Sequence, residues 1–134
     1  MLVLGTASPA GESESYNGLR LRQNDISGLL RGHGLIGIPV KIEHKSLSVG
    51  QVLSAWSNQG KLDMLLQIDD VGLEGSILKQ YVVGGTCQDL SLGYSVDVRH
   101  STTSNEKQYS KVVREVSIVR RGAREKCHIH AFSH

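Results

Sequence analysis

Residues 88–98, QDLSLGYSVDV, alternate apolar and polar side chains. Successive side chains of a β-strand point to opposite faces, so the apolar members would share one face. These members are Leu90, Leu92, Tyr94, Val96 and Val98. The serines would lie on the opposite face, with a break at Gly93. A strand with one apolar face buries it against other elements, so this segment predicts a mainly β fold.

Other stretches give the same signal for strands. They are residues 2–6, 35–44, 49–56, 61–69 and 111–122. Pro39 lacks a backbone N–H and therefore indicates an edge strand or the start of a strand. Residues 57–60, Ser-Asn-Gln-Gly, predict a hairpin turn between the third and fourth of these strands.

Two short helices are also predicted. Asn24 or Asp25 would cap the first, whose apolar residues Ile26, Leu29 and Leu30 share a face. Asp69 or Asp70 would cap the second, and Gly84-Gly85 would end it. No internal repeat or boundary divides residues 1–134, so we expect a single domain. The expected architecture is a mostly antiparallel sheet of about six strands, open or closed as a small barrel, with two short helices.

Composition narrows the function classes. The net charge of +2 is too small to favour a nucleic-acid partner. The basic residues Arg114, Arg120, Arg121, Arg124 and Lys126 are interspersed with Glu115 and Glu125, and aromatic residues for base stacking are scarce. No apolar run approaches the roughly 20 residues of a membrane span, and the start lacks the basic region of a signal peptide. We therefore expect an intracellular protein without a membrane partner, whose two cysteines are reduced thiols.

Three residue types could together carry acyl-transfer chemistry. Ser91 lies within a predicted strand and is followed by Gly93, whose missing side chain would let a substrate approach. His44 ends a predicted strand and is the best placed of six histidines to serve as its base. Glu115 interrupts an apolar strand and needs a partner if it is buried. The residues alone leave two plainer interpretations open, a solvated Ser91 and a Glu115 paired with Arg114 or Arg120.

The terminal segment His128-Ile129-His130 offers one further cluster. Alternate residues of a strand share a face, and Cys127 is adjacent, so a zinc site is conceivable. No second pair of ligands is evident, and we predict no metal or other cofactor.

Three segments together resemble the capsid-maturation serine proteases, namely phage prohead proteases and herpesvirus assemblins. Residues 37–55, GIPVKIEHKSLSVGQVLSA, are similar to the segment that holds the catalytic histidine. Residues 90–96, LSLGYSV, resemble the nucleophile strand, and residues 114–127, REVSIVRRGAREKC, resemble the strand that follows it. The opening residues 3–11 also resemble the first strand of phage members. The resemblance extends from Leu2 to Ile129 with the segments in the expected order.

This resemblance implies a herpesvirus-protease-like fold and a Ser-His-Glu triad. Ser91 would attack the scissile carbonyl, His44 would transfer the proton, and Glu115 would orient His44. The acidic third member agrees with phage proteases, whereas assemblins have histidine there. The backbone N–H of Ala123, with Arg124 in support, would stabilise the oxyanion.

The implied function is a serine endopeptidase that cleaves capsid scaffold protein, and itself, inside the assembling procapsid. The implied partners are the scaffold protein, the procapsid and the peptide substrate. A homo-oligomer is left open. We do not expect dimers of the assemblin type, because the helices through which assemblins dimerise have no counterpart after the last strand. The alternative is a non-enzymatic β-barrel module for capsid assembly or an adaptor, in which Ser91, His44 and Glu115 would lie apart.

Overall fold

The computed structural model describes residues 1–9, 13–14, 20–21, 23–31, 34–45, 47–69, 72–100, 107–121 and 127–133. Within these ranges, only the backbone is described for 13–14, 20–21, 23–25, 96–100 and 107–111.

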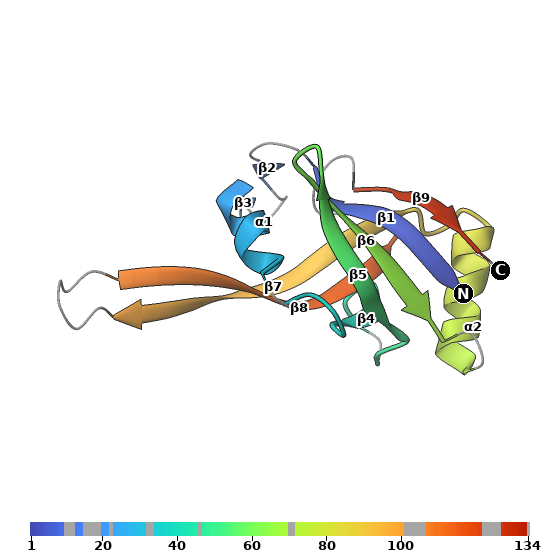
Figure 1. Cartoon of the computed structure of the whole chain (residues 1–134). Helices are drawn as coiled ribbons and strands as arrows, with labels where there is room; N and C mark the ends of the chain where they lie inside the picture. The colour runs from blue at the N-terminus through green and yellow to red at the C-terminus, as the bar shows by residue number, and fades with distance from the viewer. Residues whose placement is uncertain are drawn as a thin grey trace.

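Strands dominate the described part of the chain and account for 53% of the structure. Figure 1 shows the elements in chain order, which are β1 (Leu2–Ser8), β2 (Ser13–Glu14), β3 (Arg20–Leu21), α1 (Gln23–Leu29), β4 (Pro39–Ile42), β5 (Gly50–Asn58), β6 (Lys61–Ile68), α2 (Leu73–Val83), β7 (Asp89–His100), β8 (Lys107–Val119) and β9 (Ile129–Phe132). The prediction of a mainly β fold with two short helices is confirmed.

Seven strands form one sheet in the order β7-β8-β4-β5-β6-β1-β9, and β2 pairs with β3 separately. Five of the six neighbouring pairs in that order are antiparallel, but β4 and β8 run parallel, with Val40 opposite Val116 and Ile42 opposite Ile118. The expectation of an antiparallel sheet is therefore wrong in this one pairing. β5, the next strand along the chain, pairs with one edge of β4. The other edge of β4 pairs with β8, which follows β7 in the chain.

The sheet curls into a half-barrel and does not close. At its two ends, Asp89 and His128 form an isolated bridge. Leu90 N–H donates to Cys127 O at 2.8 Å, and Ile129 N–H donates to Gln88 O at 2.8 Å. This bridge replaces a full strand pairing, so the expectation of a closed barrel is not met. Beyond it, β7 and β8 continue away from the body as a two-stranded arm (Figure 1).

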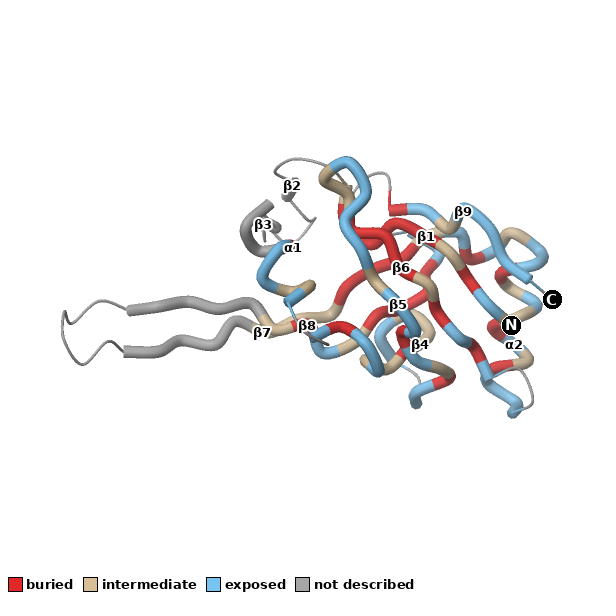
Figure 2. Tube along the Cα trace, in the orientation of Figure 1, coloured by how far each residue is buried: buried red, intermediate tan, exposed pale blue. Residues whose placement is uncertain are grey.

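Aliphatic side chains fill the concave face of the curled sheet. Leu62, Met64, Leu66 and Ile68 on β6 are almost fully buried, and so is Leu78 of α2. Figure 2 shows that the buried residues run along the strands of the body. On β7 and β8 the buried apolar residues alternate with Ser91, Glu115 and Ser117, so these polar residues share the opposite face.

The local predictions hold in most places. Gln59 and Gly60 both have positive φ, at 52° and 82°, and form the predicted two-residue hairpin turn between β5 and β6. Gly84 is the C-cap of α2, as expected, but its N-cap is Gly72 and not Asp69. Asp70, the other candidate cap, lies outside the described residues.

The two ends of the described chain lie side by side (Figure 1). Ser133 N–H donates to Leu2 O at 2.9 Å, and Leu2 N–H donates to Ser133 Oγ at 3.1 Å. These bonds directly follow the pairing of β1 with β9, a strand that the sequence did not predict. None of the described helices is long and apolar enough to cross a membrane.

Candidate active site

Ser91 lies on β7, opposite Ser117 of β8. Its flanking residues Leu90 and Leu92 point into the core and are at most 6% exposed, which fixes the orientation of the strand. Ser91 itself is only 4% exposed, so the interpretation as a solvated surface serine is wrong. Its hydroxyl instead faces a side chain that comes from another part of the sheet.

His44 lies in a tight turn just after β4, two residues beyond the end of the strand. Glu43 and His44 both have positive φ, at 51° and 62°, and Lys45 N–H donates to Ile42 O at 3.0 Å. This geometry is that of a type I′ turn, which usually contains glycine or asparagine. Left-handed residues with a Cβ cost about 1 kcal/mol each. Such strain concentrates at functional sites, where the surrounding structure holds it in place.

The parallel pairing of β4 with β8 brings this turn over the polar face of β7 and β8. Glu43 N–H donates to Ile118 O at 3.2 Å, and His44 N–H donates to Ser117 Oγ at 2.9 Å. The turn then reverses the chain, so the His44 ring lies over Ser91. The single departure from an antiparallel sheet is thus the feature that carries the histidine to the serine.

The three residues expected to form a triad are hydrogen-bonded in series. His44 Nε2 lies 2.9 Å from Ser91 Oγ, and His44 Nδ1 is hydrogen-bonded to Glu115 Oε1. A carboxylate can only accept, so Nδ1 carries the ring hydrogen and Nε2 of the neutral ring is an acceptor. Ser91 therefore donates its hydroxyl hydrogen to Nε2. This tautomer is the one that a general base requires.

Ser117 is a member of this network that the sequence analysis missed. It is fully buried, and its hydroxyl donates to Glu115 Oε2 at 2.7 Å. Ser117 Oγ also accepts the backbone N–H of His44, so Glu115, Ser117 and His44 form a closed ring of hydrogen bonds. Its position two residues after Glu115 places both on one strand face, which is the signal that could have identified it.

Gly93 has a different role from the one expected. It faces Glu115 across the two strands, and a Cβ built on it would lie 2.1 Å from Glu115 Oε1. The carboxylate occupies the space that any other side chain would need. The glycine thus makes room for the Glu115 carboxylate.

Electrostatics favour the charged form of His44. The hydrogen bond that His44 donates to Glu115 raises the pKa of His44 above its ordinary 6.5, partial burial opposes this, and the charge of Glu115 adds to the increase. The side chains of His44 and Glu115 are 40% and 12% exposed, so the acid is shielded while the ring reaches solvent. Such an arrangement stabilises the imidazolium that forms when a serine gives up its proton.

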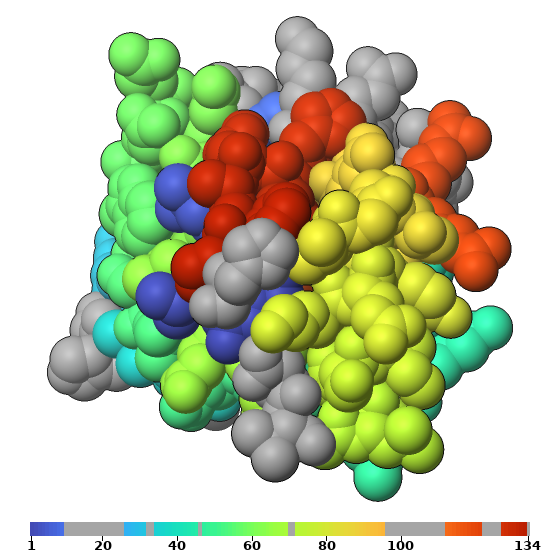
Figure 3. Space-filling model, turned by 90° about the vertical axis from the view of Figure 1, so that its right-hand side faces the viewer, coloured from blue at the N-terminus to red at the C-terminus, as the bar shows by residue number. Residues whose placement is uncertain are grey.

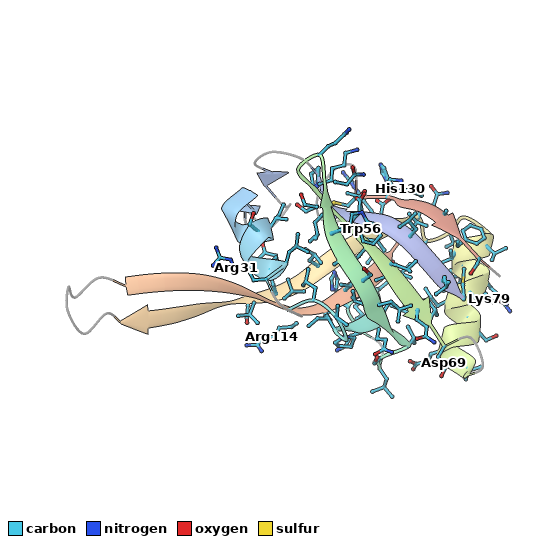
Figure 4. All side chains as sticks on the ribbon, viewed as in Figure 1. Arg31, Trp56, Asp69, Lys79, Arg114 and His130 are labelled. Carbon is cyan, nitrogen blue, oxygen red and sulfur yellow. The ribbon has the colours of Figure 1, made fainter. Side chains whose placement is uncertain are left out.

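Ala123 and Arg124, the expected oxyanion group, lie outside the described residues. His128 Nδ1 bonds Asp89 Oδ1 at 2.7 Å, whereas His130, on β9 beside β1 (Figure 4), bonds Thr6 Oγ1 at 2.6 Å. The two histidines thus have separate partners. Within the ranges given above, no three His, Cys, Asp or Glu side chains could hold a metal ion together.

Cys87 and Cys127 are both buried, and they are not joined by a disulfide, as predicted. Burial raises the pKa of the Cys87 thiol, so it is not poised as a nucleophile.

No protein-family model matches the sequence, and neither a curated protein nor a solved structure is significantly similar to it. The function must therefore be argued from the geometry of the site.

Proposed function

We propose that this chain is a serine endopeptidase in which Ser91 is the nucleophile, His44 the general base and Glu115 the acid that orients it. The observation that carries the proposal is the series of bonds from Ser91 Oγ to His44 Nε2 and from His44 Nδ1 to Glu115. The three residues come from three separate strands or turns, and one strained turn is needed to bring them together. A structural role would not require His44 Nε2 to face the Ser91 hydroxyl, nor this strain.

The chemistry follows from the positions of the atoms. Ser91 Oγ attacks the scissile carbonyl carbon while its proton moves to His44 Nε2, and Glu115 stabilises the imidazolium. The proton then passes to the leaving amine, which breaks the C–N bond and leaves an acyl-enzyme. A water molecule gives its proton to His44, attacks the ester and restores Ser91.

For the substrate, we propose a capsid scaffold protein that is cut inside the assembling procapsid. The resemblance of the three sequence segments to prohead proteases and assemblins supports this choice, and the acidic third member favours the phage type. The alternative of a non-enzymatic assembly module predicted that Ser91, His44 and Glu115 lie apart. Their convergence favours the enzyme.

A fluorophosphonate probe, which reacts only with activated serines, tests the nucleophile directly. We expect mass spectrometry to find the adduct on Ser91 and no adduct on the Ser91→Ala variant. The Ser57→Ala variant, which removes an exposed hydroxyl of β5, is the matched control and should still react. Unmodified Ser91 in the folded wild-type protein would contradict the proposed nucleophile.

The cognate scaffold protein tests the proposed substrate. Ser91→Ala should lower its cleavage by about 10⁴-fold or more, and Glu115→Gln should lower it less, since the acid orients the base and does not react. Cleavage is followed by electrophoresis and by mass spectrometry of the products. Equal cleavage by wild type and Ser91→Ala would overturn the proposal.

A further inference from the structure

A pocket of about 500 Å³ opens between the C-terminal end of α2 and β9. Its walls are partly apolar, from Val82, Val83, Ile129 and Phe132, and Gln88 and His128 add polar groups. Figure 3 looks onto this face, where β9 (red) lies beside α2 (yellow-green). No residue of the triad lines the pocket, so it is separate from the site of bond cleavage.

Strand β7 connects this pocket to Ser91. Gln88, which lines the pocket, precedes Ser91 by three residues, and Asp89 precedes it by two. A strand rises about 3.3 Å per residue, so Gln88 and Ser91 are about 10 Å apart along the chain. Asp89 and Ser91 are on the same face of the strand because alternate residues share a face. An extended peptide has the same rise, so three of its residues span this distance.

A carboxylate–imidazole pair lies between the nucleophile and the pocket. His128 Nδ1 is 2.7 Å from Asp89 Oδ1, and the two side chains are 59% and 14% exposed. The carboxylate accepts, so Nδ1 holds the hydrogen and Nε2 of the neutral ring is an acceptor on an exposed ring. The pair resembles His44 and Glu115 in its bonding, but its ring does not reach a serine in the described structure. It is suited to accept a hydrogen bond from a backbone N–H of a bound peptide.

The backbone around His128 is held from two sides. Thr6 N–H donates to His128 O at 3.0 Å, and the bonds of Leu90 to Cys127 and of Ile129 to Gln88 flank it. The pocket rim is therefore preorganised, which lowers the entropy cost of binding.

The chain has another, larger hollow of about 670 Å³, lined by Met1, Pro39 and Asp69 among others. None of its lining residues is a close chain neighbour of Ser91, as Gln88 is in the pocket beside α2. It therefore lacks the continuity with Ser91 that the pocket beside α2 has.

We propose that the pocket between α2 and β9 is the main specificity subsite of the protease. An extended peptide with its scissile carbonyl at Ser91 passes His128, which accepts one of its amide hydrogens. The peptide places the side chain three or four residues from the scissile bond in the pocket. The apolar walls select an aliphatic side chain such as leucine, isoleucine or methionine. This inference rests on the proposed function, because it needs Ser91 to be the nucleophile.

The test uses the full chain and a library of peptides of random sequence, with cleavage sites read by mass spectrometry. We expect leucine, isoleucine or methionine to be enriched at the third or fourth position on one side of the cleaved bond. In matched peptides, replacing that residue by glycine should lower kcat/KM about tenfold or more, because an apolar pocket discriminates by this order per missing group. The fluorophosphonate reaction of the same preparation reports on Ser91 independently of the pocket.

Two variants link the preference to the pocket. Val83 is 43% exposed, so Val83→Trp fills the pocket from its rim and should abolish the preference. Leu73→Trp, at the other end of α2 where the side chain is 80% exposed, is the control and should keep it. Should Val83→Trp fail to fold, Phe132→Ala enlarges the pocket and should shift the preference to larger side chains.

The outcomes separate the two proposals. If Ser91 reacts with the probe but cleavage shows no preference at these positions, or does not occur, the subsite is wrong and the nucleophile stands. A preference that survives both Val83→Trp and Phe132→Ala overturns the subsite as well. If Ser91 does not react with the probe, the proposed function fails and the subsite fails with it.

Discussion

Gly93 and Glu115 face each other across β7 and β8, and the carboxylate of Glu115 lies where any side chain on residue 93 would begin. The pairing breaks register directly after this position, between Gly93 and Tyr94. The missing side chain of Gly93 and the adjacent β-bulge leave space for the Glu115 carboxylate against β7. There the carboxylate is hydrogen-bonded to both His44 and Ser117. The acid of the triad is thus positioned by a residue that has no side chain.

Gly93→Ala should therefore inactivate the protein without unfolding it. The added Cβ would lie 2.1 Å from Glu115 Oε1, so the carboxylate must move away from His44. We expect kcat/KM to fall about 10²-fold or more, because small misplacements of catalytic groups have effects of this size. Gly28→Ala is the matched control, since a Cβ there meets nothing within 4 Å. A Gly93→Ala variant with wild-type kcat/KM would show that the glycine has no part in placing the acid.

Ser117→Ala should weaken the support of the triad and leave its three members in place. It removes the donor to Glu115 Oε2 and the acceptor of the His44 N–H, two bonds of the closed ring. Loss of a buried hydrogen-bond partner costs about 1–3 kcal/mol, so the melting temperature should fall by several degrees. We also expect kcat to fall with little change in KM, since Ser117 positions the base. A merely structural role would lower the melting temperature and leave the pH dependence of kcat unchanged.

The sequence could predict most of the elements and the three residues that are hydrogen-bonded in series, but not how the elements meet. Alternation along β7 indicated that Ser91 faces away from the apolar side, and the glycines marked the end of α2 and the hairpin turn. The parallel pairing of β4 with β8 depends on contacts between residues that are about 76 positions apart, such as Val40 and Val116. No local pattern encodes such a contact.

The turn at Glu43 and His44 and the strand β9 also could not be predicted from local sequence. The left-handed turn at Glu43 and His44 contradicts local preference, and the tertiary structure holds it through His44 N–H and Ser117. The sequence after Cys127 indicates a histidine cluster more clearly than a strand, because His128 and His130 interrupt the apolar residues of β9. That strand is defined by its pairing with β1, which a terminal segment does not reveal by itself.

The β5–β6 hairpin offers a test of the fold that is independent of function. Gln59 has φ 52° and precedes Gly60 in a type I′ turn, where asparagine is strongly preferred. Gln59→Asn should stabilise the protein by about 0.5–1 kcal/mol and raise the melting temperature by a few degrees. Calorimetry measures the change, and Ser57→Asn, at an extended position of β5, should not increase stability. A melting temperature lowered by Gln59→Asn would contradict the turn geometry.

The raised pKa of His44 gives opposite pH dependences for activity and stability. Catalysis needs Nε2 unprotonated, so kcat/KM should rise with pH and reach half its plateau above pH 6.5, the ordinary value for histidine. Glu115→Gln removes the hydrogen bond that is the main cause of the shift, so the midpoint should move to lower pH while the plateau falls. If Glu115→Gln leaves the pH midpoint of kcat/KM unchanged, the group that titrates is not His44.

Stability should show the reverse trend. A folded-state pKa above the unfolded value means that the protonated ring stabilises the fold. This contribution is fully present below pH 6.5 and is lost as the pH rises through the pKa of the folded protein. The difference in melting temperature between wild type and Glu115→Gln should therefore be larger at pH 5.5 than at pH 9. An equal difference in melting temperature at both pH values would contradict this prediction. It would mean that the Glu115 carboxylate does not stabilise the charged imidazolium of His44 that the mechanism needs.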